Sequence, residues 1–139
     1  MTEPKIRDYL LGKIQPSELE RSEKKTDGKV LPYYKEVEMI EEGEFKIEKS
    51  HLISVCDDVL SGKMKLETLG QFSFILIGSD YFHWDNETNE GQRIGEVLFE
   101  WNNPTINYPL TMGNIREWKK YLEGHGRNMR TDYGRQQKL

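Results

Sequence analysis

Two carboxylates and one imidazole lie within six positions of the sequence, at Asp80, His83 and Asp85. Such groups hold divalent metal ions and exchange protons with substrates, so this cluster is the strongest candidate for catalysis in the chain. Its spacing matches no dedicated metal-ligand motif. The same residues also suit structural roles: Asp80 can cap a turn, Asp85 with Asn86 can cap the following helix, and His83 can bond a backbone carbonyl. We favour these structural roles and keep a metal-assisted hydrolase using Asp80, His83 and Asp85 as an alternative.

Three aromatic residues, Tyr81, Phe82 and Trp84, stand in the same short segment. Aromatic side chains in polar loops are favoured anchors at protein interfaces, particularly when charged residues surround them. Carboxylates beside such anchors steer a basic partner toward the surface. The alternative is that the rings fold inward and seal one end of the protein. The predicted partner-binding surface consists of Tyr81, Trp84, Asp85, Glu87 and Glu90.

The rest of the sequence offers no further catalytic set. Cys56 is the single cysteine, which excludes an intramolecular disulfide, and its helical apolar surroundings predict a buried side chain. His51 and His125 pair with neither Cys56 nor a serine in any known pattern, and no nucleophile elbow, phosphate loop or H-E-x-x-H motif is present. Gly91 and Gly95 stand four residues apart and indicate close helix packing. We therefore predict no catalytic residues, no metal and no cofactor.

The net charge of −4 conceals a strong asymmetry along the chain. Eight acidic residues between positions 36 and 58 are opposed by Lys46 and Lys49, and positions 80–100 are acidic apart from Arg93. Such a field repels nucleic acid and attracts basic proteins. After Gly124 the balance reverses, because Asp132 alone opposes Arg127, Arg130, Arg135 and Lys138. We expect a basic protein partner and keep a nucleic-acid-associated regulator acting through this basic tail as an alternative.

Apolar residues spaced three and four apart predict four helices, at about 50–60, 66–79, 89–101 and 112–123. The second has apolar residues nearly all round, which predicts that it is the most buried. Trp101, on the apolar stripe of the third helix, should face inward. The expected core also contains Leu69, Phe72, Leu76, Val97, Leu98 and Trp118. The predicted fold class is mainly α: a compact irregular bundle of about four core helices, with an N-terminal helical arm and one or two short strands.

This pattern divides the chain into a loosely docked helical arm (1–29), a single helical domain (30–124) and a basic flexible tail (125–139). In the arm, Thr2, Pro4 and the apolar residues up to Ile14 predict one helix, and residues 17–25 predict a second, largely exposed helix. Residues 30–40 are predicted to be irregular or to form one short strand. Phe45 and Ile47 predict another short extended piece.

One local resemblance is present near the start of the chain. The sequence Asp8-Tyr9-Leu10-Leu11-Gly12, followed by Ser17-Glu18-Leu19-Glu20, resembles the opening of bacterial anti-sigma factors. In that family a similar helix pair precedes a zinc site. The resemblance covers about the first twenty residues, and the cysteines and histidine of that site are missing here, so it implies no functional residue in this chain.

No apolar run approaches the ~20 residues of a membrane span, and the start of the chain lacks the apolar stretch of a signal peptide, so we expect a cytoplasmic protein without a membrane partner. The small size, the acidic body and the aromatic-rich loops favour a non-enzymatic protein-binding module. The most specific hypothesis is an acidic inhibitor of the immunity or antitoxin type, encoded by a bacterium or a phage. Such a protein neutralises a basic toxin or effector by occupying a cleft built for phosphate charge.

Overall fold

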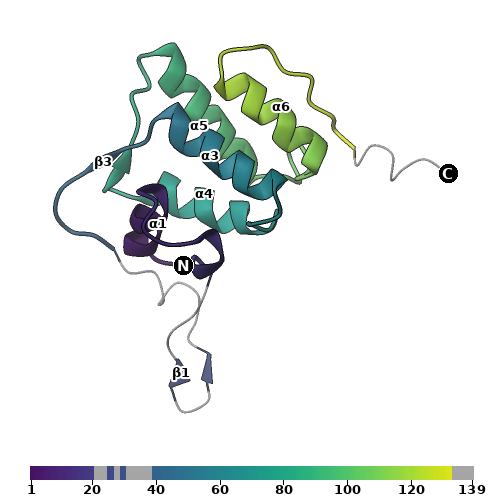
Figure 1. Cartoon of the computed structure of the whole chain (residues 1–139). Coiled ribbons are helices and arrows are strands. Elements are labelled where there is room, and N and C mark those ends of the chain that lie inside the picture. Colours follow the sequence, from purple (N-terminus) through teal and green to yellow (C-terminus); the bar gives the residue numbers. More distant parts are fainter. Residues whose placement is uncertain (21–24, 27–28, 31–38, 133–139) are drawn as a thin grey trace.

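The protein is mainly helical, as its sequence predicts. The computed structural model describes residues 1–20, 25–26, 29–30 and 39–132 (Figure 1). The helices within these residues are α1 (Glu3–Leu10), the 3-10 helix η1 (Pro16–Glu18), α3 (Lys49–Leu60), α4 (Thr68–Gly78), α5 (Asn89–Asn102) and α6 (Met112–Leu122). The strands are β1 (Lys25–Thr26), β2 (Lys29–Val30), β3 (Phe45–Lys46) and β4 (Phe82–His83), all of two residues.

Helix α5 is the centre of the bundle. It packs against α4, α6 and α3, while α3 packs against α6 and α1 lies beside α4 (Figure 1). All six residues predicted for the core are completely buried, and so is Trp101. The rings of Trp101 and Trp118 meet edge to face at 6.2 Å between centroids, which joins α5 to α6. The predicted core is therefore confirmed.

Local sequence sets the ends of these helices. The hydroxyl of Thr88 accepts a hydrogen bond from the backbone N–H of Gly91 at the start of α5, and Thr111 does the same for Asn114 at the start of α6. These bonds satisfy N–H groups that have no partner inside the helix. After α6, Gly124 adopts a positive φ of 103°, a conformation that suits glycine and ends the helix.

Helix α4 is buried on one face and exposed on the other. Although it is apolar nearly all round, Phe74 is 55% exposed and Ile77 is 43% exposed. The opposite face carries Leu69, Phe72 and Leu76 and fills the core, where the ring of Phe72 lies 6.5 Å from that of Tyr9 in α1. The prediction that this helix is the most buried agrees with its buried share, since six of its 11 residues are buried against five of 14 in α5. Its burial is one-sided, however, because its main partner is α5, whereas α5 contacts three helices.

The predicted helix at 17–25 is wrong in extent. The 3-10 helix covers Pro16–Glu18, and Lys25–Thr26 is a strand that pairs antiparallel with Lys29–Val30. One apolar side chain, Leu19, is too few to give a helix a buried face, and Leu19 is itself completely buried. In α1, Ile6 and Tyr9 also belong to the main core. The extended piece predicted at 45–47 is confirmed by β3, whereas most of the segment predicted at 30–40 lies outside the described residues.

Among the described residues, no helix combines the length and the apolar character needed to cross a membrane.

Two neighbouring positions in α4 test this assignment of faces. Replacing the buried Leu76 by Ala should lower the free energy of unfolding by roughly 2–5 kcal/mol, because it leaves a cavity between α4 and α5. Replacing Ile77, which is 43% exposed, by Ala should cost less than about 1 kcal/mol. Chemical denaturation followed by circular dichroism measures both values. Equal losses at the two positions would show that the faces are misassigned.

Candidate partner-binding surface

The surface is organised by the parallel pairing of β3 with β4. The backbone N–H of Phe45 donates to the carbonyl of Tyr81 at 2.8 Å, and that of Ile47 donates to the carbonyl of His83 at 2.8 Å. Phe45 thereby lies opposite Phe82, and Lys46 opposite His83. This pairing brings the acidic segment before α3 against the aromatic loop between α4 and α5, although more than thirty residues separate them in the sequence.

Aromatic rings fill the space behind these strands. Phe82 is buried, and its ring centroid lies 5.0 Å from that of Tyr81 and 5.6 Å from that of Phe45. The ring of Phe45 also lies 5.2 Å from the imidazole of His51 in α3. Tyr81 and Phe45 are half-buried, so each ring contributes to the core and leaves one edge accessible. The loop is therefore anchored by its own aromatic residues.

Trp84 and Asp85 rest on two glycines of α5. A Cβ atom added to Gly91 would lie 1.6 Å from the carbonyl oxygen of Asp85, and one added to Gly95 would lie 3.0 Å from Nε1 of the half-buried Trp84. The sequence associates these glycines with the packing of one helix on another. The structure shows instead that they admit the preceding loop: at Gly91 a side chain would collide with the loop backbone, and at Gly95 it would crowd the Trp84 ring.

The three acidic members of the predicted surface differ in their contacts. The Asp85 carboxylate accepts a hydrogen bond from the backbone N–H of Glu87 at 2.9 Å and so caps a turn. Glu87 is exposed. The Glu90 carboxylate accepts a bond from the backbone N–H of Lys49 at 3.3 Å, which ties the start of α5 to the start of α3. Asp85 and Glu87 thus face solvent, while Tyr81, Trp84 and Glu90 are each half-buried.

The strand pairing unites the two acidic stretches of the sequence. Within the described residues, this surface carries eight acidic residues and two lysines, Lys46 and Lys49. Among the residues that the structure describes, no basic side chain forms an ion pair with Glu41, Glu42, Asp80 or Glu87. Sequence reasoning treats the two stretches as separate surfaces and misses their union. The one sequence feature that hints at this union is the short extended piece predicted at 45–47. A strand of this kind needs a second strand to pair with, and the sequence does not say which segment supplies it. We call the united region the acidic surface: Glu41, Glu42, Glu44, Glu48, Asp80, Asp85, Glu87 and Glu90.

The three residues of the predicted metal cluster, Asp80, His83 and Asp85, do not share a contact. The imidazole Nε2 of His83 lies 3.2 Å from a carboxylate oxygen of Glu44 and not beside a backbone carbonyl, and Asp85 caps its own turn. Thr88 caps α5, so the cap predicted at Asp85 and Asn86 is wrong. The turn at the end of α4 is capped by the hydroxyl of Ser79, which accepts from the N–H groups of Tyr81 and Phe82, and not by Asp80. In the part of the chain that is described, no three His, Cys, Asp or Glu side chains are grouped to hold a metal ion.

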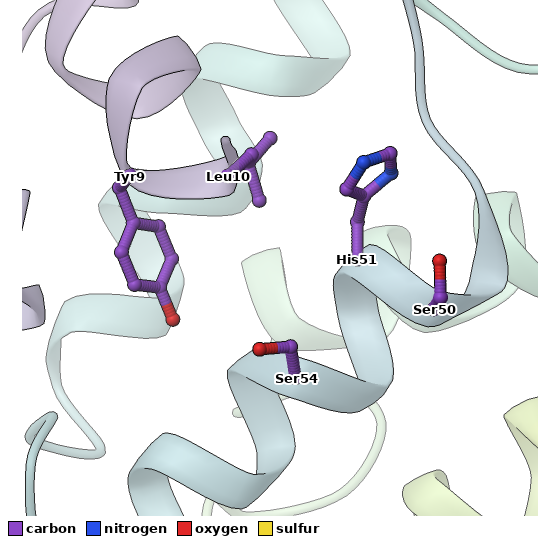
Figure 2. Close-up of a pocket in the computed structure, with 5 residues that line it drawn as sticks. All are labelled: Tyr9, Leu10, Ser50, His51 and Ser54. Carbon is purple, nitrogen blue, oxygen red and sulfur yellow. The ribbon is translucent and has the colours of Figure 1, made fainter. Parts of the chain in front are cut away.

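A small pocket lies between α1 and α3. Its volume is about 210 Å³, and it is lined by Tyr9 and Leu10 of α1 and by Ser50, His51 and Ser54 of α3 (Figure 2). The Nδ1 atom of His51 accepts a hydrogen bond from the backbone N–H of Glu48 at 2.9 Å, and partial burial lowers the pKa of the imidazole. Because Nδ1 accepts this hydrogen bond, the neutral ring carries its proton on Nε2. None of the described hydrogen bonds joins His51 to a serine, so the pocket lacks a nucleophile–base pair.

Two further groups that could take part in chemistry, the Cys56 thiol and the Tyr9 hydroxyl, belong to buried residues. Cys56 is completely buried, and this burial raises the pKa of its thiol to about 12, so the group stays protonated and unreactive. The Tyr9 hydroxyl donates to Asp58 at 2.5 Å, and burial raises its pKa. The buried position predicted for Cys56 is confirmed.

The basic end of the chain is occupied by internal contacts as far as it is described. Arg127 forms an ion pair with Glu100 of α5, and Arg130 lies 3.4 Å from Asp132. The side chain of Met129 packs against the core. Arg135 and Lys138, on which the nucleic-acid alternative also depends, lie outside the described residues.

The contact between Gly91 and the loop has a direct test. Replacing Gly91 by Ala should lower the free energy of unfolding by roughly 1–3 kcal/mol, because the new methyl group displaces the Asp85 carbonyl. Gly70 in α4 is the matched control, since a Cβ there meets nothing within 4 Å. Its replacement by Ala should be neutral or stabilise by up to about 1 kcal/mol. Urea denaturation of both variants gives the comparison, and a stable Gly91→Ala protein would rule out the close contact.

No protein-family model matches the chain, and the searches of curated proteins and of solved structures likewise find no match.

Proposed function

We propose that this protein is a non-enzymatic binding module for a basic protein, an inhibitor of the immunity or antitoxin type, and that it binds through the acidic surface. The observation that carries the proposal is the β3–β4 pairing, which joins two acidic segments across one end of the bundle. A partner that meets this end encounters both segments together. The combined charge is larger than either stretch of the sequence provides alone.

The charges of this surface favour long-range attraction of a basic partner. Most of its carboxylates are exposed, and Glu41, Glu42, Asp80 and Glu87 form no ion pair within the described residues. Uncompensated charge of one sign produces a field that steers an oppositely charged protein into the correct orientation and raises the rate of association. A toxin or effector that acts on nucleic acid presents positive charge of this kind at its working cleft.

The aromatic rings supply the short-range part of such an interface. Trp84 and Tyr81 are half-buried, so their orientation is already fixed before a partner arrives. Rigid aromatic side chains contribute contact area with little loss of conformational entropy, and they are enriched among the residues that dominate binding energy. The acidic rim and the aromatic centre thus perform separate tasks in one interface.

Charge reversal on both segments tests whether they form one binding surface. Glu42→Lys and Glu87→Lys change exposed carboxylates on opposite sides of the strand pair, and Glu67→Lys at the start of α4 makes the same charge change elsewhere. Immobilised wild type and variants are exposed to an extract of the native cell. We expect a polypeptide that wild type and Glu67→Lys retain, that salt elutes, and that both other variants lose.

Kinetics with the captured protein complete this test. Each reversal on the acidic surface should slow association by about tenfold and reduce its dependence on salt, with little change in the dissociation rate. Equal effects from all three reversals would indicate non-specific attraction and contradict the proposed surface. Unchanged rates for Glu42→Lys and Glu87→Lys would place binding elsewhere.

Trp84 should affect the other rate constant. Truncating Trp84 to Ala should accelerate dissociation by at least about tenfold, because it removes a desolvated contact, and leave association nearly unchanged. The melting temperature of the free variant is the necessary control, since Trp84 packs over Gly95. A variant that keeps the wild-type dissociation rate would show that Trp84 serves only to seal the loop.

A further inference from the structure

A second feature lies away from the acidic surface, where the chain returns along α6 after that helix ends. We call residues 124–132 the C-terminal strap; it runs back toward the start of α6 (Figure 1). Its central contact is Arg127, which donates two hydrogen bonds to the carboxylate of Glu100, at 2.6 and 3.1 Å. The same guanidinium lies 4.2 Å from the ring centroid of Tyr121 and 5.7 Å from that of Tyr108.

These contacts form a binding site with the features that select arginine. We call it the arginine seat, or the seat: Glu100, Trp118, Tyr121 and Tyr108. A planar guanidinium can bind a carboxylate through two parallel hydrogen bonds and stack on an aromatic ring at the same time, whereas a lysine ammonium cannot do both. The side chain of Glu100 is only 12% exposed with Arg127 in place. A carboxylate so poorly hydrated has a strong requirement for a positive partner.

The seat belongs to the helices and not to the strap. The indole N–H of the buried Trp118 donates to Glu100 at 2.8 Å and fixes that carboxylate. Tyr121 is held by Glu96, which accepts a hydrogen bond from its hydroxyl, and by Arg93, which donates to its backbone carbonyl. These residues lie on α5 and α6, and Tyr108 lies in the loop between the two helices. Glu100 and Tyr121 are therefore positioned by contacts that do not involve the strap.

Apart from Arg127, the strap is held mainly through backbone hydrogen bonds. The backbone N–H of Asn128 donates to Glu117, and Asn114 exchanges two hydrogen bonds with the backbone of Arg130. Met129 is its one side chain packed against the core, and most of its other residues are exposed. A segment with so little buried apolar surface opens locally at a much smaller free-energy cost than global unfolding.

We propose that the seat formed by Glu100, Trp118, Tyr121 and Tyr108 is a binding site for an arginine side chain of a basic protein, and that Arg127 of the strap occupies it as an internal competitor. Release of the strap exposes the site. The incoming arginine then makes the contacts that Arg127 made, which are two hydrogen bonds to Glu100 and a contact with the ring of Tyr121. The assignment of that arginine to a basic protein partner rests on the proposed function. The arginine selectivity of the seat does not depend on it.

The test uses the full-length chain with Arg127→Ala and a blocked Gly-Arg-Gly peptide as the probe, with blocked Gly-Lys-Gly as the matched control. Calorimetric titration should show saturable binding of the arginine peptide to Arg127→Ala, at least about ten times tighter than that of the lysine peptide. The arginine peptide should also raise the melting temperature of this variant and shift its tryptophan emission. Wild type should bind the peptide more weakly, because its own Arg127 competes at high effective concentration.

A second variant, Arg127→Ala combined with Glu100→Gln, separates the seat from general attraction to an acidic protein. It should remain folded and lose the preference for arginine over lysine. Three results would overturn the proposal: no saturable binding to a folded Arg127→Ala protein, equal binding of the two peptides, or loss of the folded state in Arg127→Ala, which would make the strap a fixed part of the fold. None of these measurements involves the acidic surface, so failure here leaves the proposed function to its own test.

Discussion

Two backbone hydrogen bonds, from Phe45 to residue 81 and from Ile47 to residue 83, bring the two acidic segments together in the acidic surface. They form a parallel pair, and parallel strands need a long connection between them. Helices α3 and α4 supply that connection here. The position of the acidic segment therefore depends on how α3 and α4 are arranged about α5, and the bundle acts as the scaffold of a pairing only two residues long.

A strand pair this short is not stable by itself, and the acidic side chains around it repel one another. The aromatic residues behind it oppose both tendencies. Phe82 is buried, and Phe45 and Tyr81 pack against it, so the strands lie on an apolar layer while the carboxylates remain in water. Solvent and salt weaken the repulsion between exposed charges without weakening this apolar contact. The arrangement lets the protein concentrate negative charge at one place without burying it.

Helix α5 connects the two surfaces proposed here. Near its start, Gly91 and Gly95 accept the loop that carries Trp84 and Asp85. Near its end, Glu100 faces α6 and receives Arg127 from the strap. Between these two ends, Ile94, Val97 and Leu98 fill the core. One helix thus contributes to the geometry of both the acidic surface and the arginine seat, which gives both a common support.

The sequence by itself determined the helices, most of their limits and the composition of the core. The three- and four-residue spacing of Leu98 and its neighbours, and the cap at Thr111, act over a few residues and need no distant partner. Only the tertiary structure decided which face of α4 stays in water, since Phe74 and Leu76 are equally apolar and differ in the neighbours that surround them. It likewise decided that two acidic stretches form one surface and that Arg127 reaches Glu100. Pairings between distant segments depend on the packing of every helix between them, and a local pattern of residues does not contain that information.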